Sequence, residues 1–224
     1  MSVRAAPSED LRLRLHGFFR SSTAFRVRAA LNLKALSYAQ TTYVLRQGEH
    51  RSEAYRALNP QGLVPTLETG EGMLPQSLAI LEWLDETYPT PPLLPDTAWA
   101  RARVRSLSQM IALDVHPINN LRVLFYLRDH FGADEDAQAA WFRHWVREAF
   151  GPLDQRLAND AQTGRFCHGD APGLADLCLA GQVVNNRRFG IDPAPYPTIA
   201  RIFDACMALP AFVDAMPQNQ PDAG

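Results

Sequence analysis

Three consecutive hydroxyl side chains follow an arginine near the start of the chain, in the run Arg20, Ser21, Ser22 and Thr23. The run comes where a strand pattern gives way to a helix pattern, so we expect it at a helix N-terminus. Unpaired backbone N–H groups and the positive end of the helix dipole favour an anion there. The same residue types also serve as ordinary N-caps, so the run by itself leaves anion binding and capping open.

A proline inside a strand pattern is the second candidate feature. Pro65 lies in the segment NPQGLVPTLE, where its missing N–H would interrupt a strand ladder unless it lies at an edge, at a bulge or in a cis turn. In a cis turn the backbone amide and carbonyl of Val64 would be exposed to a peptide-like ligand. An edge proline or a bulge is an equal alternative.

Another predicted helix N-terminus lies at Gln76 and Ser77. Its side chains and backbone N–H groups can hold a carboxylate. Simple capping again explains the same residues.

Polar side chains cluster in the segment DVHPINNLRVLFY, within a helical pattern that runs from about residue 99 to 131. At about 100° per residue, Asn119 and Arg122 share one face of this helix and Asn120 lies on the neighbouring one. Pro117 would bend the helix. A polar binding face and a solvated, kinked helix are both open.

A further arginine is expected on an inward face. Arg188 falls on the apolar stripe of its predicted helix, so it should point to the buried or cleft side, whereas Arg187 lies off that stripe. A charge in that position needs a partner, which could be an internal carboxylate or the carboxylate of a substrate.

The elements that would position these residues begin with the order βαβαββα. Residues 11–19 alternate Leu with Arg or His and predict a half-buried strand, and a helix follows from Ser22 to Lys34 with its charged residues mostly away from the apolar stripe. The remaining elements are a strand at 38–44, a weak helix ending near Leu58, a strand at 63–68, a hairpin at 69–72, a return strand at 73–74, and a helix from Ser77 that stops before Pro89.

The chain then changes character. Four prolines between residues 88 and 95 predict a linker, and only helical patterns follow, at 99–131, 135–159, 173–188 and 196–208. We therefore expect a disordered tail at residues 1–10, an α+β domain at 11–88, a linker at 89–98, an all-helical domain at 99–216 and a C-terminal tail at 217–224.

Composition restricts the partners and the compartment. The net charge of -2 gives no global basic field, so neither nucleic acid nor an anionic membrane is expected as a partner. Cys167, Cys178 and Cys206 are widely spaced, which indicates no disulfide framework and no zinc site, and the first two look like small buried apolar residues. A reducing cytoplasm fits this pattern, and no residue spacing predicts a metal.

Taken in order, these motifs resemble the zeta class of the glutathione transferase family. The class signature SSCxxRVRxAL compares with Ser21–Leu31, and the segments ALNPQGLVPTLE, LPQSLAILEWL, DVHPINNLRVLFYL, GRFCHGD and ADLCL are similar to the same class. The motifs cover nearly the whole chain and lie closest to bacterial maleylacetoacetate and maleylpyruvate isomerases.

Two positions depart from the family pattern. Thr23 replaces the cysteine of the signature, so no protein thiol is available there and the reactive sulfur is expected to be that of glutathione. Gly173 replaces the usual Ser or Thr of a capping box whose acid is Asp176. Asp176 can still accept from the helix start, and glycine at an N-cap costs only a few tenths of a kcal/mol.

The resemblance implies a thioredoxin-like, glutathione-binding N-terminal domain, an all-helical substrate-binding domain, and a homodimer. It implies that Ser21, aided by Ser22 or Thr23, activates the thiol of glutathione, which is not consumed. The implied glutathione residues are His50, Gln61, Val64, Pro65, Gln76, Ser77 and Asn120, and the implied ligands of a dicarboxylate substrate are Arg20, Arg122 and Arg188.

The implied reaction is isomerisation of maleylacetoacetate to fumarylacetoacetate in tyrosine and phenylalanine catabolism, by thiolate addition, bond rotation and elimination. Maleylpyruvate of gentisate catabolism is the alternative substrate, and Leu121 beside Arg122 leans slightly to the larger acid. Conjugation or dehalogenation of small α-halo acids and a non-catalytic glutathione-binding module stay open as other functions.

Overall fold

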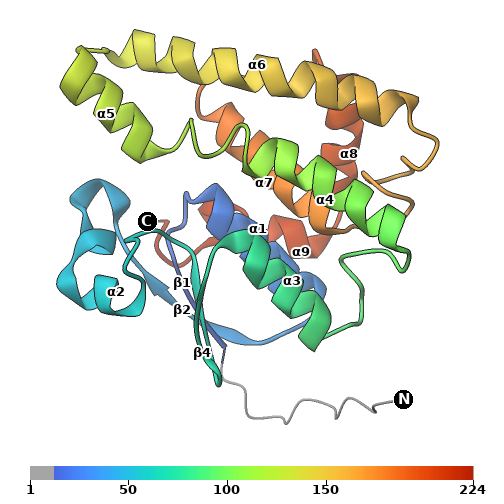
Figure 1. Cartoon of the computed structure of the whole chain (residues 1–224), viewed down its shortest axis with the longest axis horizontal. Helices are drawn as coiled ribbons and strands as arrows, with labels where there is room; N and C mark the ends of the chain where they lie inside the picture. The colour runs from blue at the N-terminus through green and yellow to red at the C-terminus, as the bar shows by residue number, and fades with distance from the viewer. Residues whose placement is uncertain (1–12, 224) are drawn as a thin grey trace. The chain divides into compact units, whose positions relative to one another are not determined.

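The computed structural model describes residues 13–223 and divides them into two compact units (Figure 1). The first unit holds the described residues up to Pro92 together with the C-terminal segment from Ala211 onward, and the second unit spans Leu93–Pro210. The tail predicted at residues 1–10 and the first two residues of the predicted first strand lie outside the described part.

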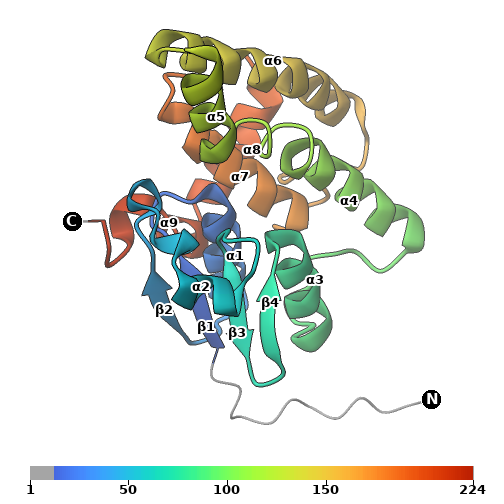
Figure 2. The same ribbon diagram turned by 60° about the vertical axis from the view of Figure 1, so that its left-hand side comes forward.

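A four-stranded mixed sheet forms the centre of the first unit, in the order β2-β1-β3-β4 (Figure 2). β1 pairs in parallel with β2 and antiparallel with β3, which forms a hairpin with β4. Within β1, Leu13 and Leu15 are buried and Arg14 is exposed, as the alternating pattern predicts. The strands are β1 (Leu13–Gly17), β2 (Tyr38–Thr42), β3 (Thr66–Thr69) and β4 (Gly72–Pro75).

Helices complete this unit in the predicted order βαβαββα, which the structure confirms. α1 packs against α3, and α2 follows two short turns of 3₁₀ helix. The helices are α1 (Ser22–Leu33), α2 (Glu53–Leu58) and α3 (Ser77–Thr87), and the 3₁₀ turns are η1 (Leu45–Gln47) and η2 (Glu49–Arg51).

The sequence predicts that the charged residues of α1 and its C-cap lie mostly away from the apolar stripe. In the structure these residues are buried, so they do not form a solvent-exposed face. Arg26 and Arg28 are each 1% exposed and Lys34 is 7% exposed. Lys34 Nζ donates to the Tyr88 carbonyl at 2.6 Å and lies 3.6 Å from Asp85 Oδ1. Burial is tolerated because the charge has partners, which apolar periodicity alone cannot reveal.

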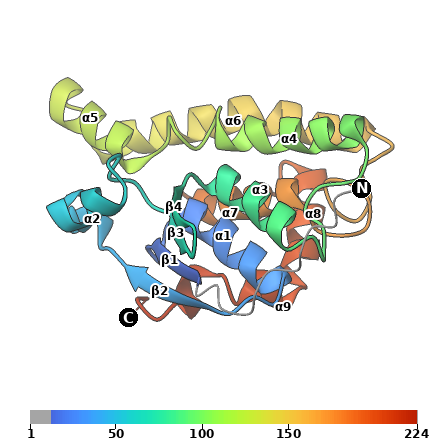
Figure 3. The same cartoon turned by 60° about the horizontal axis from the view of Figure 1, so that its bottom comes forward.

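The C-terminal segment returns to the first unit, whereas the sequence places residues up to 216 in the helical domain. It contains most of α9 (Pro210–Val213) and η3 (Pro217–Asn219). The Asn32 side chain of α1 donates to the Ala211 carbonyl at 3.0 Å, and the Gln40 side chain of β2 donates to Gln220 at 3.3 Å. Figure 3 shows the segment (red) beside β2. These contacts draw the segment away from the helices that precede it in the chain.

The second unit is helical, as predicted. α4 packs against α7 and α6, and α8 packs against α6 and α7; Figure 3 shows α4 and α6 side by side. The helices are α4 (Ala98–Ala112), α5 (Leu121–Phe131), α6 (Glu135–Asn159), α7 (Leu174–Arg187) and α8 (Pro197–Met207).

The continuous kinked helix predicted over residues 99–131 is wrong, because residues 113–120 form turns that separate α4 from α5. Pro117 lies in this break, where its missing backbone N–H does not cost an intrahelical hydrogen bond. The Asn119 side chain is buried and donates to the Phe142 carbonyl at 3.3 Å. Asn120 caps α5, since its side chain accepts from the Arg122 N–H at 3.1 Å. Both asparagines therefore stabilise non-helical backbone.

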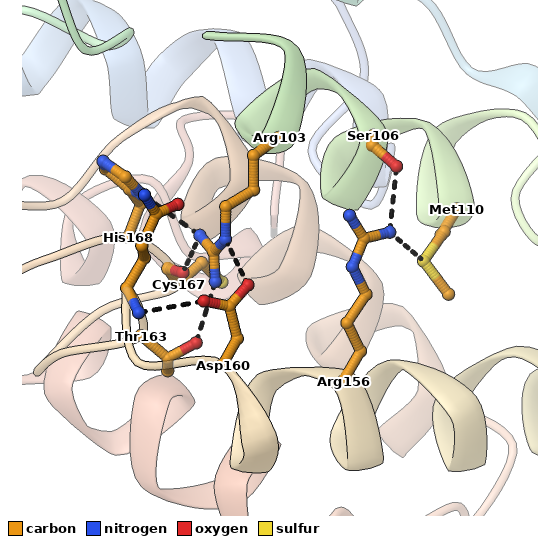
Figure 4. A network of polar contacts seen from close by, with 9 residues as sticks. Arg103, Ser106, Met110, Arg156, Asp160, Thr163, Cys167 and His168 are labelled. Atoms are coloured by element: carbon orange, nitrogen blue, oxygen red, sulfur yellow. Dashed lines mark hydrogen bonds and ion pairs between the residues drawn. The ribbon is translucent and has the colours of Figure 1, made fainter. Parts of the chain in front are cut away.

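A polar network fastens α4 to the segment after α6 (Figure 4). The buried guanidinium of Arg103 donates to Asp160 Oδ2 at 2.6 Å, to Thr163 Oγ1 at 2.9 Å and to the Cys167 carbonyl at 2.9 Å. Its Nη1 lies 3.1 Å from His168 Nδ1. Because an arginine can only donate, His168 Nδ1 must act as the acceptor.

The start of α7 keeps its capping bond without a capping hydroxyl. Asp176 Oδ2 accepts from the Gly173 N–H at 2.9 Å, which confirms that Asp176 accepts from the helix start, and Oδ1 accepts from the Cys167 N–H at 2.8 Å. A Cβ atom on Gly173 would lie 2.8 Å from the Leu93 carbonyl oxygen. That carbonyl already accepts from the Leu174 N–H at 2.9 Å, so the close approach of two backbone segments accounts for the glycine.

Among residues 13–223, none of the helices combines the length and the apolar character needed to span a membrane. The same part of the chain contains no cluster of His, Cys, Asp and Glu that could hold a metal ion. All three cysteines are free and buried, which confirms the expectation for Cys167 and Cys178.

Candidate active site

The N-terminus of α1 carries a chain of hydroxyl groups. Ser21 is the N-cap, and its Oγ accepts from the Ala24 N–H at 3.1 Å. The same oxygen lies 2.9 Å from Thr23 Oγ1, which donates to the Val64 carbonyl at 3.2 Å. Because Thr23 uses its one proton on the Val64 carbonyl, Ser21 is the donor in its contact with Thr23. The Ser21 lone pair that accepts from Ala24 leaves this proton able to turn to a bound anion by rotation of the hydroxyl. Capping and anion binding are therefore compatible. The remaining hydroxyl residue of the run, Ser22, is buried.

The Val64–Pro65 bond is cis, which was one of the predicted alternatives. Pro65 directly precedes β3 and does not interrupt its ladder. The Val64 N–H forms no hydrogen bond within residues 13–223, and Val64 is partly exposed. A peptide-like ligand can therefore bond this amide.

Two residues that were not predicted from the sequence hold the segment before Pro65. The Tyr55 hydroxyl donates to the Leu63 carbonyl at 2.7 Å, and the Asn59 amide donates to the same oxygen at 2.8 Å. Both side chains also contact the buried Thr66 hydroxyl, at 3.0 and 3.1 Å. Asn59 belongs to the segment NPQGLVPTLE, and its 2% exposure shows that it is an internal support.

Gln76 has a backbone conformation that side chains rarely adopt, with φ 72° and ψ 112°. It is the N-cap of α3, and its side-chain amide donates to Gln61 Oε1 at 2.8 Å. Strain of this kind costs on the order of 1–3 kcal/mol and clusters at functional sites. The next residue, Ser77, is buried and accepts from Arg26 Nη1 at 3.3 Å. A buried positive charge thus lies beside a helix N-terminus, and both favour a carboxylate.

His50 lies buried in η2 beside Gly62, where its carbonyl would be 3.1 Å from a Cβ atom at that glycine. Its Nδ1 is buried and has no hydrogen-bond partner in the described part of the chain. Burial, followed by the charges of Arg51 and Arg56, lowers the pKa of His50 below the ordinary value. The imidazole is therefore neutral at pH 7, with one ring nitrogen that the described residues leave without a hydrogen bond.

The three predicted substrate arginines are all exposed, with Arg20 in the first unit and Arg122 and Arg188 in the second. The Arg20 guanidinium lies 4.8 Å from the centre of the Phe19 ring. Arg122 is in the first turn of α5, and its guanidinium forms no hydrogen bond or ion pair with residues 13–223. Asn120, the cap of that helix, uses its side-chain oxygen there, and its NH₂ group bonds no residue in the described range.

The predicted orientation of Arg188 toward a buried face is wrong. α7 ends at Arg187, and Arg188 is its exposed C-cap, with Nη1 3.3 Å from Asn185 Oδ1. Arg187 lies over the Phe203 ring at 4.6 Å. A helical wheel extended past the last turn no longer describes where a side chain points.

The sequence profile of the glutathione S-transferase N-terminal domain matches residues 15–92. A maleylpyruvate isomerase from a Ralstonia species is 49% identical, over 94% of this chain and 100% of its own length. A solved maleylpyruvate isomerase, described as a bacterial glutathione transferase of the zeta class, superposes with a TM-score of 0.92 at 49% identity and covers 94% of this chain and 100% of that one. This chain belongs to the zeta class of glutathione transferases.

Another solved relative contains two bound ligands. Maleylacetoacetate isomerase from Methylobacterium extorquens AM1 matches with a TM-score of 0.91 and 44% identity, over 94% of this chain and 99% of that one. That structure contains glutathione and malonate. A relative of the same architecture therefore binds both a tripeptide thiol and a small dicarboxylate.

Proposed function

We propose that this protein is a glutathione-dependent cis–trans isomerase that converts maleylacetoacetate to fumarylacetoacetate. The observation that carries the proposal is the Ser21 hydroxyl, whose oxygen caps α1 while its proton can bond a thiolate at the positive end of the helix. The family membership and the ligands bound to the relative from Methylobacterium extorquens support glutathione as the source of that thiolate.

The residues of the first unit fit glutathione. The N-terminus of α3, with Gln76, Ser77 and the nearby Arg26, suits a carboxylate of the tripeptide, and the Val64 amide suits a peptide carbonyl. His50 offers a neutral imidazole nitrogen. The full proposed set is His50, Gln61, Val64, Pro65, Gln76, Ser77 and, from the second unit, the side-chain NH₂ of Asn120.

Bound glutathione supplies a thiolate that adds reversibly to the cis double bond, so that the bond can rotate before elimination gives the trans isomer. A free thiol with a pKa near 8.5 is only a few per cent ionised at neutral pH. Ser21, aided by the helix dipole, has to lower that pKa by about 1–2 units, which is about 1.4–2.7 kcal/mol. One charge-assisted hydrogen bond and a helix terminus are sufficient for this.

The three arginines bind the dicarboxylate in this proposal. Guanidinium groups form paired hydrogen bonds with carboxylates, and one placed at the substrate's keto oxygen stabilises the negative charge that develops there. All three side chains are exposed, which supports the assignment. The guanidinium of Arg122 also forms no hydrogen bond or ion pair with the described residues. Arg20 and Arg188 complete the proposed set.

Maleylpyruvate is the second candidate substrate, favoured by the relative from Ralstonia at 49% identity. Steady-state rates with both acids, each measured with and without glutathione, test the proposal. We expect turnover only with glutathione and a larger kcat/KM for maleylacetoacetate. A larger value for maleylpyruvate would reassign the substrate within the same reaction.

A small α-halo acid in the same assay tests the alternative that the protein is a conjugating or dehalogenating transferase. In that case glutathione appears in a product, whereas the isomerase returns it unchanged. Efficient reaction of the halo acid combined with no isomerisation of either dienoic acid would contradict the proposal. Tight glutathione binding with no turnover of any of these compounds would instead identify a binding module.

We further propose that the protein acts as a homodimer in the cytoplasm. Large apolar side chains are exposed in the second unit, with Trp99 at 78% and Phe131 at 72%, and a second copy of the chain would bury such side chains. Free, buried cysteines fit a reducing compartment. Light scattering should give twice the 25.0 kDa mass of one chain, and a monomer mass would exclude the dimer.

A further inference from the structure

The turn that carries Arg20 and Ser21 is held by residues to which the proposed function gives no role. The Ser21 N–H donates to the Phe18 carbonyl at 2.9 Å and closes this turn between β1 and α1. Its second residue is Phe19, whose N–H donates to Asp222 Oδ2 at 3.0 Å. The Phe19 carbonyl accepts from Arg28 Nη2, also at 3.0 Å. Both backbone polar groups of this turn residue are thus bound by side chains from outside the turn, one from α1 and one from the C-terminal segment.

Arg28 connects the turn to the C-terminal segment. Its Nε and Nη2 donate to the Ala215 carbonyl at 3.1 and 3.0 Å, while Nη1 reaches the Phe18 carbonyl at 3.4 Å. Burial lowers the pKa of Arg28 to about 10, with Tyr38 and Asp222 acting in the opposite direction, so the group stays charged at neutral pH. A planar guanidinium with several fixed partners allows little movement of the backbone it holds.

The C-terminal segment presents Asp222 from a fixed position. Gln220 is buried and donates to the carbonyls of Asp214 and Met216, at 2.7 and 3.0 Å. Ala215 is fully buried, and the Phe212 ring lies 6.4 Å from that of Phe25 in α1. These contacts belong to the first unit alone, so the segment is an integral part of the domain that carries Ser21.

We propose that Asp222 and Arg28 are positioning residues, which latch the turn at Phe19 and so fix Arg20 and Ser21 for catalysis. The inference rests on the proposed function for the roles of Arg20 and Ser21. Phe19 transmits the constraint in two ways, because the Arg20 guanidinium lies over its ring at 4.8 Å and the peptide after it leads directly to the N-cap of α1. Small displacements of catalytic groups can cost about 100-fold in rate.

Three variants at exposed or partly exposed positions test the latch. Asp222→Ala removes the acceptor of the Phe19 N–H, whereas Asp222→Asn retains a side-chain oxygen that can accept it. Asp214→Ala is the matched control, because it removes one negative charge from an exposed position in the same segment. Asp222 lies near the end of the chain and is partly exposed, so we expect all three variants to fold.

The first readout needs no cofactor or substrate. Amide hydrogen exchange of Phe19, followed by NMR, should be about tenfold faster or more in Asp222→Ala, because the bond that protects it is gone. Asp222→Asn and Asp214→Ala should keep the protection of the wild type. Equal exchange in Asp222→Ala and Asp214→Ala would overturn the latch, whatever the catalytic activity.

The second readout separates positioning from a merely structural role. In Asp222→Ala we expect kcat to fall about tenfold and the thiol pKa of bound glutathione to rise, with the KM for glutathione within about threefold of the wild type. Asp222→Asn should restore both values. Faster exchange with unchanged kcat and thiol pKa would overturn the positioning role. If the wild type isomerises neither acid, the proposed function fails, and the exchange and thiol pKa results still decide the latch.

Discussion

The Ser21 hydroxyl lies 2.9 Å from the hydroxyl of Thr23, which itself donates to the Val64 carbonyl. These contacts join the start of α1 to the backbone in front of β3, and they use the residue that stands in place of the cysteine of the class signature. Thr23 thus supports the geometry around Ser21 and adds no protein thiol. The chemistry of the site depends on the serine hydroxyl and on the sulfur of a bound ligand.

Removing the Ser21 hydroxyl should raise the thiol pKa of bound glutathione. In Ser21→Ala we expect a rise of about 1–2 units and a loss of about 10- to 100-fold in kcat/KM at neutral pH, measured by thiolate absorbance and steady-state rates. Ser21→Gly is the matched variant, because glycine retains most of the capping energy. The two should share the kinetic defect and differ by about 1 kcal/mol in unfolding free energy. An unchanged thiol pKa in both would remove Ser21 from the mechanism.

Arg122 should matter for the substrate and not for glutathione. Arg122→Ala loses charge-assisted bonds to a carboxylate, so we expect kcat/KM for the dicarboxylate to fall about 100-fold while the Kd of glutathione changes less than about twofold. Arg128→Ala is the control on the same helix, since Arg128 already bonds Asp129 at 2.7 Å. Calorimetry and steady-state rates give the two values. Equal losses of turnover and glutathione affinity would contradict the assignment.

The strained backbone at Gln76 should lower the stability of the protein, while the Gln76 side chain contributes to glutathione binding. Gln76→Gly removes the penalty of a side chain at φ 72°, so the unfolding free energy should rise by about 1 kcal/mol while glutathione affinity falls with the lost amide. Gln76→Ala loses the same amide and keeps the strain, so it should bind equally weakly with no gain in stability. Chemical denaturation and calorimetry measure both. A glycine variant with full affinity would show that the Gln76 side-chain amide has no binding role.

Only part of this site could be predicted from the sequence. Ser21 to Thr23, Pro65 and Ser77 stand out because turns and helix starts require particular residue types over a few positions. Arg28 and Asp222 carry no such local signal, since they meet at Phe19 only after the C-terminal segment has packed against α1. The order of helices and strands was predictable because apolar periodicity is a local property of the sequence. The contacts at Phe19 join separate segments of the chain, so periodicity could not predict them.

The wrong expectations have a common cause as well. Pro117, Asn119 and Asn120 interrupt a pattern that is otherwise helical, and whether such a segment kinks or unwinds depends on partners such as the Phe142 carbonyl. Arg188 was assigned to an inward face by extending a helix one residue beyond its end. In both cases the outcome depends on helix termini, where intrahelical bonding stops.

Stability should decrease as the pH falls below the ordinary pKa of histidine. Burial, and then Arg103, lower the pKa of His168, while Asp160 acts in the opposite direction. Between the lowered value and 6.5 the unfolded chain therefore binds more protons than the folded one. The unfolding free energy then decreases as the pH falls, by no more than about 1.4 kcal/mol per pH unit for one group. His50, whose pKa is also lowered, contributes with the same sign.

Replacing His168 tests this directly. His168→Asn keeps a side-chain oxygen that can accept from Arg103 (Figure 4) but cannot be protonated in this range. Denaturant unfolding at a series of pH values from 7 to 5 should show a shallower slope for the variant, with similar stability near pH 7. An identical slope in wild type and variant would mean that His168 does not contribute to acid destabilisation.

The most direct test of the central claim follows both the acid and the thiol in one reaction. Proton NMR of maleylacetoacetate with the enzyme and a small, substoichiometric amount of glutathione reports the cis and trans isomers and the state of the thiol. We predict complete conversion to the trans isomer, no conversion without glutathione, and recovery of all the glutathione at the end. Conversion at the same rate without glutathione, or consumption of one thiol per product, would contradict the account.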